Sequence, residues 1–130
     1  MLVEDDVDLA RVIAAGFDRH GIRTIHVTSG GAAIEEASKM TPDLLILDIG
    51  LPDIDGYAVV DWLKDHDMLR SVPVVVYSAS EPTPSQRERL TLGPTEFLTK
   101  SRIAPEEFER RVIQLLDNVT SAPGEISHVA

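Results

Sequence analysis

Residues 42–56 read PDLLILDIGLPDIDG, and this stretch indicates the kind of fold. Leu44 to Leu47 form an uninterrupted apolar run that has the length of a strand and no polar face. Such a run is typical of a central strand in a parallel sheet that helices cover on both sides. Asp48 ends the run and turn residues follow it, so its carboxylate is expected at the edge where open α/β sheets bind ligands. The alternative is that Asp48 only caps the next helix.

Strand and helix patterns alternate along the rest of the chain. Short runs typical of strands cover residues 2–4, 22–27, 44–47, 72–78 and 96–99, and apolar residues with helical spacing cover residues 8–20, 32–40, 57–69, 85–92 and 105–119. Five strands alternating with five helices predict an α/β fold with a parallel sheet and helices on both faces. We expect one domain over residues 1–119 and a flexible C-terminal tail over residues 120–130. The first strand is short enough to be a truncated one.

Composition excludes several classes of protein. The chain has no cysteine, so it has neither a disulfide framework nor a thiolate metal site. Its 12 Lys and Arg residues against 22 Asp and Glu residues give a net charge of −10. Such an acidic domain repels phosphate backbones and anionic membranes, so we expect no direct binding to nucleic acid or membrane. Acidic residues 4–6 rule out a signal peptide and no apolar run is long enough for a membrane span, so the expected location is cytoplasmic.

Polar side chains follow four of the five predicted strands. Asp5 and Asp6 follow the first strand, Asp48 the third, Ser78 the fourth and Lys100 the fifth. Parallel strands end at one edge of a sheet, so these side chains should lie together. Clustered carboxylates repel one another unless a cation joins them, and an all-oxygen site suits Mg²⁺. A lysine and a hydroxyl beside them would contact phosphoryl oxygens, and one carboxylate could act as a nucleophile that forms an acyl phosphate.

These motifs together resemble the CheY-like receiver domain of two-component response regulators. The resemblance covers roughly residues 1–119 and rests on Glu4-Asp5-Asp6, Leu47-Asp48, Leu51-Pro52-Asp53-Ile54-Asp55-Gly56, Tyr77-Ser78-Ala79 and Phe97-Leu98-Thr99-Lys100. It implies a flavodoxin-like, doubly wound, five-stranded parallel sheet with strand order 2-1-3-4-5 and five helices. It also implies a phosphoacceptor signalling domain that takes a phosphoryl group from a histidine kinase or a histidine phosphotransfer protein.

The resemblance assigns a metal site to this edge of the sheet. Asp6 and Asp48 would bind Mg²⁺ directly, and the backbone carbonyl of Gly50 would be a further ligand. Asp5 would act mainly through a water molecule. Nearby, Asp53 and Asp55 are expected to be turn and capping residues rather than metal ligands.

The resemblance also assigns the phosphoryl contacts and the switch. Asp48 would be the phosphoacceptor, and Lys100, the Ser78 hydroxyl and the Ala79 backbone N–H would contact the phosphoryl oxygens. Ser78 and the aromatic side chain of Phe97 would then move and change the surface that partners recognise. The domain could form a homodimer through this surface, and the output domain or target protein is not specified by the sequence.

One position departs from the family pattern. Ser101 follows Lys100 where receiver domains usually have a proline, often after a cis peptide bond. A cis bond before a non-proline residue costs about 3 kcal/mol, so we expect a trans bond and a rearranged loop here. Gly50 and Ser80 lie two residues after Asp48 and Ser78, at positions that by the resemblance affect how long the phosphoryl group survives. Neither offers a carboxamide or carboxylate to assist an attacking water, which favours slow self-dephosphorylation.

Two other functions are compatible with the same residues. The Ser101 departure would suit a receiver-like interaction module that works without phosphorylation. The acidic site would also suit a Mg²⁺-dependent phosphohydrolase with an aspartyl nucleophile. That enzyme would need a further acid or base and a segment that encloses its substrate, for which 130 residues leave little room.

Overall fold

A parallel sheet of five short strands forms the middle of the molecule. The computed structural model describes residues 1–119 and 128–129 of the chain. The strands are β1 (Leu2–Val3), β3 (His26–Val27), β4 (Leu45–Leu47), β5 (Val74–Ser78) and β6 (Thr95–Thr99). Their order in the sheet is β3-β1-β4-β5-β6, and all neighbouring pairs are parallel. Because β3 is the second half of the predicted strand 22–27, this confirms the doubly wound order 2-1-3-4-5.

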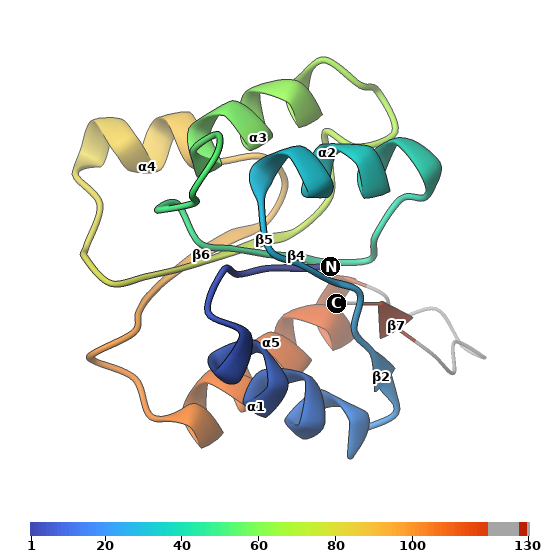
Figure 1. The fold of residues 1–130 in the computed structure, drawn as a ribbon, viewed down its shortest axis with the longest axis vertical. Helices are drawn as coiled ribbons and strands as arrows, with labels where there is room; N and C mark the ends of the chain where they lie inside the picture. Colours follow the sequence, from blue (N-terminus) through green and yellow to red (C-terminus); the bar gives the residue numbers. More distant parts are fainter. Residues whose placement is uncertain (120–127, 130) are drawn as a thin grey trace.

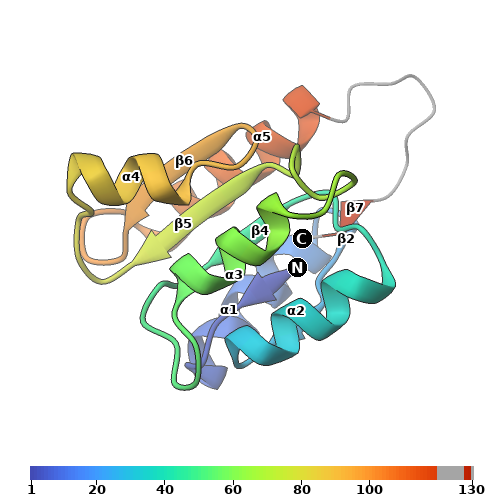
Figure 2. The ribbon, with the colours of Figure 1, turned by 90° about the horizontal axis from the view of Figure 1, so that it is seen from above.

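Five helices cover the two faces of this sheet. They are α1 (Val7–Asp18), α2 (Gly30–Lys39), α3 (Gly56–Lys64), α4 (Pro84–Leu90) and α5 (Pro105–Val119). Helices α1 and α5 lie on one face, and α2, α3 and α4 lie on the other (Figures 1 and 2). None of the helices in the described part of the chain is long and apolar enough to cross a membrane.

The two central strands supply side chains to both layers, as a strand apolar on both faces should. From β4, Leu45 and Leu47 pack in the core under α2 and α3, where they meet Val59 and Leu63. Ile46 points to the other face and belongs to the core that includes Phe17 of α1 and Phe108 of α5. The uninterrupted apolar run is therefore explained by burial of the strand between two helical layers.

The structure divides the predicted strand 22–27. Residues Ile22–Arg23 form β2, which pairs in parallel with β7 (His128–Val129) rather than with the main sheet. The β7 strand falls within residues 120–130, predicted as a flexible tail, and the rest of that stretch lies outside the described residues.

The predicted helix 57–69 is shorter in the structure. The α3 helix ends at Lys64, and the chain continues in turns in which the His66 amide donates to the Leu63 carbonyl and the Leu69 amide to the His66 carbonyl. These hydrogen bonds join residues three positions apart, as in a 3₁₀-helix, whereas the bonds of an α-helix join residues four positions apart.

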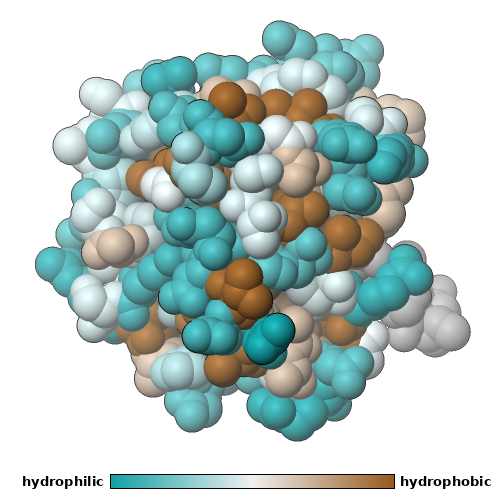
Figure 3. All heavy atoms as spheres, viewed as in Figure 1, coloured by the Kyte–Doolittle hydropathy of each residue, from teal (hydrophilic) through white to brown (hydrophobic). Residues whose placement is uncertain are grey.

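Few large hydrophobic side chains of the described residues are exposed to solvent. Hydrophilic side chains cover most of the face shown in Figure 3, with smaller hydrophobic areas between them. Val7, Val12 and Met68 are the exposed large hydrophobic residues of the described part of the chain.

Candidate functional site

Three carboxylates meet at the carboxyl edge of the sheet. Oxygen atoms of Glu4, Asp5 and Asp48 all lie within 4.8 Å of one another. The strand register explains this meeting, because Val3 pairs with Leu47 and the next residues of both strands leave the sheet at the same level. Glu4 and Asp48 are buried, with 2% and 9% of their surfaces exposed, whereas Asp5 is exposed.

Asp6, predicted to bind the metal directly, is not part of this carboxylate group. The β1 strand ends at Val3, so the acidic pair at the edge is Glu4 and Asp5. Asp6 precedes α1 and is its N-cap, with Oδ1 accepting a hydrogen bond from the Leu9 amide at 3.1 Å. Sequence reasoning did not place Glu4 in the site. A signal was available, because Asp6 lies three residues before the apolar helical position Leu9, which is typical of an N-cap and leaves Glu4 and Asp5 at the end of the strand.

Lys100 joins the two buried carboxylates. Its Nζ lies 2.7 Å from Oε1 of Glu4 and 3.0 Å from Oδ2 of Asp48. The pairing of β5 and β6 continues into this residue, because the Lys100 amide donates to the Ser78 carbonyl at 2.8 Å. The predicted proximity of Asp48 and Lys100 is thereby found in the structure.

Burial and ionic hydrogen bonds have opposite effects on the pKa values of Glu4 and Lys100. Burial raises the pKa of Glu4, and the hydrogen bonds from Lys100 and the Asp6 amide offset only part of this rise. Burial lowers the pKa of Lys100, but its bonds to Glu4 and Asp48 outweigh the burial, so that the pKa lies above its usual value. Lys100 therefore stays an ammonium at neutral pH.

The other predicted site residues lie at or near the same edge. Ser78 ends β5 and is 3% exposed, and its hydroxyl donates to the Ser80 carbonyl oxygen at 2.6 Å. The Gly50 amide donates to Oδ1 of Asp48 at 3.1 Å, so the backbone after β4 turns back over the carboxylate. Ala79 directly follows Ser78 on the exposed side of this edge.

Phe97 lies within β6 rather than at its end. Its side chain is half-buried and packs against the core under α2, α3 and α4. The Arg87 guanidinium from α4 lies 4.9 Å from the centroid of the Phe97 ring. A cation so close to an aromatic face is attracted by it, so Phe97 is held between the core and α4.

The loop after β4 is fixed by the two carboxylates that we expected to be capping residues. Asp53 accepts hydrogen bonds from the amides of Gly30 and Gly31, both at 2.9 Å, at the beginning of α2. The pKa of Asp53 is lowered mainly by the hydrogen bond from the Gly31 amide and next by the one from the Ile54 amide. Asp55 is the N-cap of α3 and accepts from the Ala58 amide at 2.9 Å. The alternative in which Asp48 caps the next helix is therefore wrong.

The peptide bond between Lys100 and Ser101 is trans, as expected, since the described residues include no cis peptide bond. The turn is closed by the Arg102 amide, which donates to the Thr99 carbonyl at 3.0 Å.

The carboxylate group and Lys100 suit a divalent cation and a phosphoryl group together. With all three carboxylates ionised, they and the Lys100 ammonium would carry a net charge of −2, which a divalent cation would balance. All the donors are oxygen atoms, which Mg²⁺ prefers. Lys100 contacts Asp48 directly, and a group attached to that carboxylate would lie beside the ammonium.

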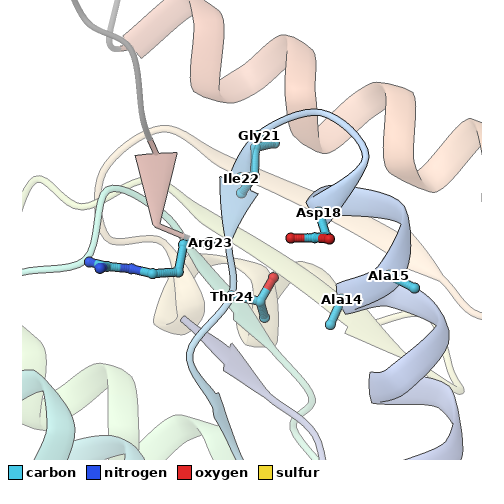
Figure 4. A pocket seen from close by; sticks show the side chains of 7 residues that line it. All are labelled: Ala14, Ala15, Asp18, Gly21, Ile22, Arg23 and Thr24. Carbon is cyan, nitrogen blue, oxygen red and sulfur yellow. The ribbon is translucent and has the colours of Figure 1, made fainter.

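An open pocket of about 500 Å³ between α1 and β2 lies elsewhere (Figure 4). Its polar side chains are Asp18, Arg23 and Thr24, and it adjoins the beginning of the predicted strand 22–27. The carboxyl ends of the strands, where Asp48 lies, are at the opposite edge of the sheet.

The chain is similar in sequence and in fold to several known proteins. Residues 1–113 match the family described as response regulator receiver domain. The polar-differentiation response regulator DivK of Brucella anthropi is 32% identical over 108 residues, which cover 83% of this chain and 87% of DivK. The receiver domain of a signal transduction histidine kinase from Syntrophus aciditrophicus is 31% identical, with a TM-score of 0.77 and coverage of 95% and 93%. The Mn²⁺-bound form of the response regulator Rcp1 is 25% identical, with a TM-score of 0.70 and coverage of 96% and 95%.

Proposed function

The chain belongs to the response regulator receiver domain family, and from this premise we propose that Asp48 accepts a phosphoryl group in two-component signalling. The observation that supports this most is the ammonium of Lys100, 3.0 Å from Asp48 and 2.7 Å from Glu4. We propose a histidine kinase or a histidine phosphotransfer protein as the donor, and a cytoplasmic location for the reaction.

We assign a Mg²⁺ site to the carboxylate group. Both oxygens of Glu4 already accept hydrogen bonds, one from Lys100 and one from the Asp6 amide, whereas the carboxylate of Asp5 is exposed. Asp5 and Asp48 are therefore the direct ligands in our proposal, with the Gly50 carbonyl as a third. Glu4 does not contact the ion directly. Bound Mg²⁺ would neutralise negative charge on the phosphoryl oxygens. The Mn²⁺-bound form of Rcp1 is a similar structure that supports a divalent cation here.

The residues of the chain then divide the phosphoryl transfer among them. A carboxylate oxygen of Asp48 attacks phosphorus, an O–P bond forms, and the N–P bond of the donor phosphohistidine breaks with its electron pair going to the imidazole. Lys100 moves from Asp48 to a phosphoryl oxygen. The Ser78 hydroxyl and the Ala79 amide donate to the other oxygens.

The signal is a change of surface driven by the added charge. The acyl phosphate adds about one unit of negative charge to the site. In our proposal Ser78 turns toward it and Phe97 follows, which alters the surface of α4, β6 and α5. That surface would contact a target protein, an output domain or a second copy of the chain.

Intact mass spectrometry after incubation with acetyl phosphate tests the proposal. The wild type should gain one phosphoryl group in the presence of Mg²⁺ and none in EDTA, and Asp48→Asn should gain none. Asp117→Asn is the matched control, because Asp117 is an exposed carboxylate on α5. If folded wild-type protein gains no phosphoryl group, the interaction module that works without phosphorylation becomes the better account.

A further inference from the structure

The carboxylate of Glu81 connects three separate segments beside the site. Glu81 lies in the loop between β5 and α4. Its Oε1 lies 3.4 Å from a guanidinium nitrogen of Arg87, which belongs to α4. Its Oε2 lies 3.0 Å from a guanidinium nitrogen of Arg102, two residues after Lys100. One side chain thus ties the loop after β5 to the next helix and to the loop after β6.

The backbone beside Glu81 accepts the hydrogen bond of the Ser78 hydroxyl. Ser80 directly precedes Glu81, and its carbonyl oxygen accepts the hydrogen bond from the Ser78 hydroxyl at 2.6 Å. A hydroxyl has a single proton to donate. Ser78 cannot donate to a phosphoryl oxygen on Asp48 until it leaves Ser80, and the segment that holds Ser80 is the one that Glu81 anchors.

The same contacts reach the aromatic residue of the expected switch. Arg87, which pairs with Glu81, also lies over the Phe97 ring at 4.9 Å from its centroid. Ser78 and Phe97 are therefore both linked to Glu81, the first through the backbone of Ser80 and the second through Arg87.

We propose that Glu81 restrains the switch in its unphosphorylated arrangement. This inference rests on the proposed function, since it concerns the response of Ser78 to a phosphoryl group on Asp48. Interactions present in only one of two arrangements shift the population toward that arrangement. The ion pairs of Glu81 therefore oppose release of Ser78 and slow phosphorylation of Asp48. Because the side chains of Glu81, Arg87 and Arg102 are 52%, 43% and 70% exposed, salt should weaken the restraint.

The test compares Glu81→Gln with Glu88→Gln. Glu88 is an exposed residue of α4 that makes no ion pair within the described residues, so its substitution removes the same charge without the contacts. The rate of Mg²⁺-dependent phosphorylation by acetyl phosphate is measured by intact mass at about 0.05 M and about 0.5 M salt. We expect E81Q to react about two- to fivefold faster than both the wild type and E88Q at low salt. At high salt the wild type should approach the rate of E81Q.

A double-variant comparison checks that the pair with Arg102 carries the effect. Arg102→Gln should also accelerate the reaction. The variant with both substitutions should react at the same rate as E81Q within experimental error. Equal rates for the wild type, E88Q and E81Q at low salt would overturn the restraint while leaving the phosphoacceptor role of Asp48 intact. If none of these proteins takes up a phosphoryl group, the proposed function fails and the restraint fails with it.

Discussion

Lys100 Nζ lies 2.7 Å from an oxygen of Glu4, a carboxylate with only 2% of its surface exposed. A buried carboxylate without a cation is costly, so the lysine contributes to stability as well as to the chemistry proposed for Asp48. The two residues are nearly a whole domain apart in sequence, and the parallel register of β1, β4, β5 and β6 brings them together.

Substitution of Lys100 should lower stability. Lys100→Met leaves Glu4 and Asp48 without their cation, and we expect the free energy of unfolding at neutral pH to fall by about 2 to 3 kcal/mol. Urea denaturation measures this fall. Lys39→Met, which removes a lysine from an exposed face of α2, should cost less than about 1 kcal/mol. Equal losses in the two variants would show that the buried pair does not stabilise the fold.

The pH dependence of stability should show that the pKa of Glu4 is raised in the folded protein. Its pKa is raised in the folded state, so the folded protein binds a proton more tightly than the unfolded chain does. The stability from this group is fully present below the unfolded pKa of about 4.5 and is lost as pH rises through the folded pKa. Glu4→Gln should remove this loss, so the stability of E4Q relative to the wild type should improve from pH 4.5 upward. A constant difference between the two proteins in urea titrations across this range would contradict the raised pKa.

The division of roles between Asp5 and Asp6 can be separated by amide substitutions. Asp5→Asn should raise the Mg²⁺ concentration needed for phosphorylation about tenfold or more, because it removes a direct ligand in our proposal. Asp6→Asn should change it little, since asparagine is also a good N-cap. Phosphorylation yield against Mg²⁺ concentration gives both values. The reverse order would favour Asp6, and not Asp5, as the direct metal ligand.

Asp53 should matter for stability and not for phosphorylation. Asp53→Ala removes the acceptor for the Gly30 and Gly31 amides, and we expect the protein to unfold at a lower urea concentration than the wild type. The yield of the phosphoryl adduct in Mg²⁺ should be unchanged. A large fall in yield with no loss of stability would instead place Asp53 in the site.

The sequence was sufficient to predict the architecture and that Asp48, Ser78 and Lys100 lie at one edge of the sheet, because both depend on where buried strands end. The apolar run before Asp48 and the β-branched run before Ser78 marked two neighbouring strands, and the five-strand alternation implied their common edge. The end of the first strand could not be located, since Glu4, Asp5 and Asp6 are all acidic. Only the pairing of Val3 with Leu47 decides which of them face Asp48.

Contacts between distant segments could not be predicted from local sequence patterns either. The divided strand 22–27 depends on pairing of β2 with β7 at the other end of the chain. The engagement of Ser78 by Ser80 and the ion pairs of Glu81 depend on the path of loops that turn signals alone do not specify.

The central claim is that Asp48 itself carries the phosphoryl group. Borohydride reduces an aspartyl phosphate to homoserine, which peptide mass spectrometry locates by residue. After incubation with acetyl phosphate and Mg²⁺, we expect homoserine at position 48 and at no other aspartate. Homoserine at Asp5, Asp6 or another carboxylate, or a phosphorylated protein with none at position 48, would contradict the account.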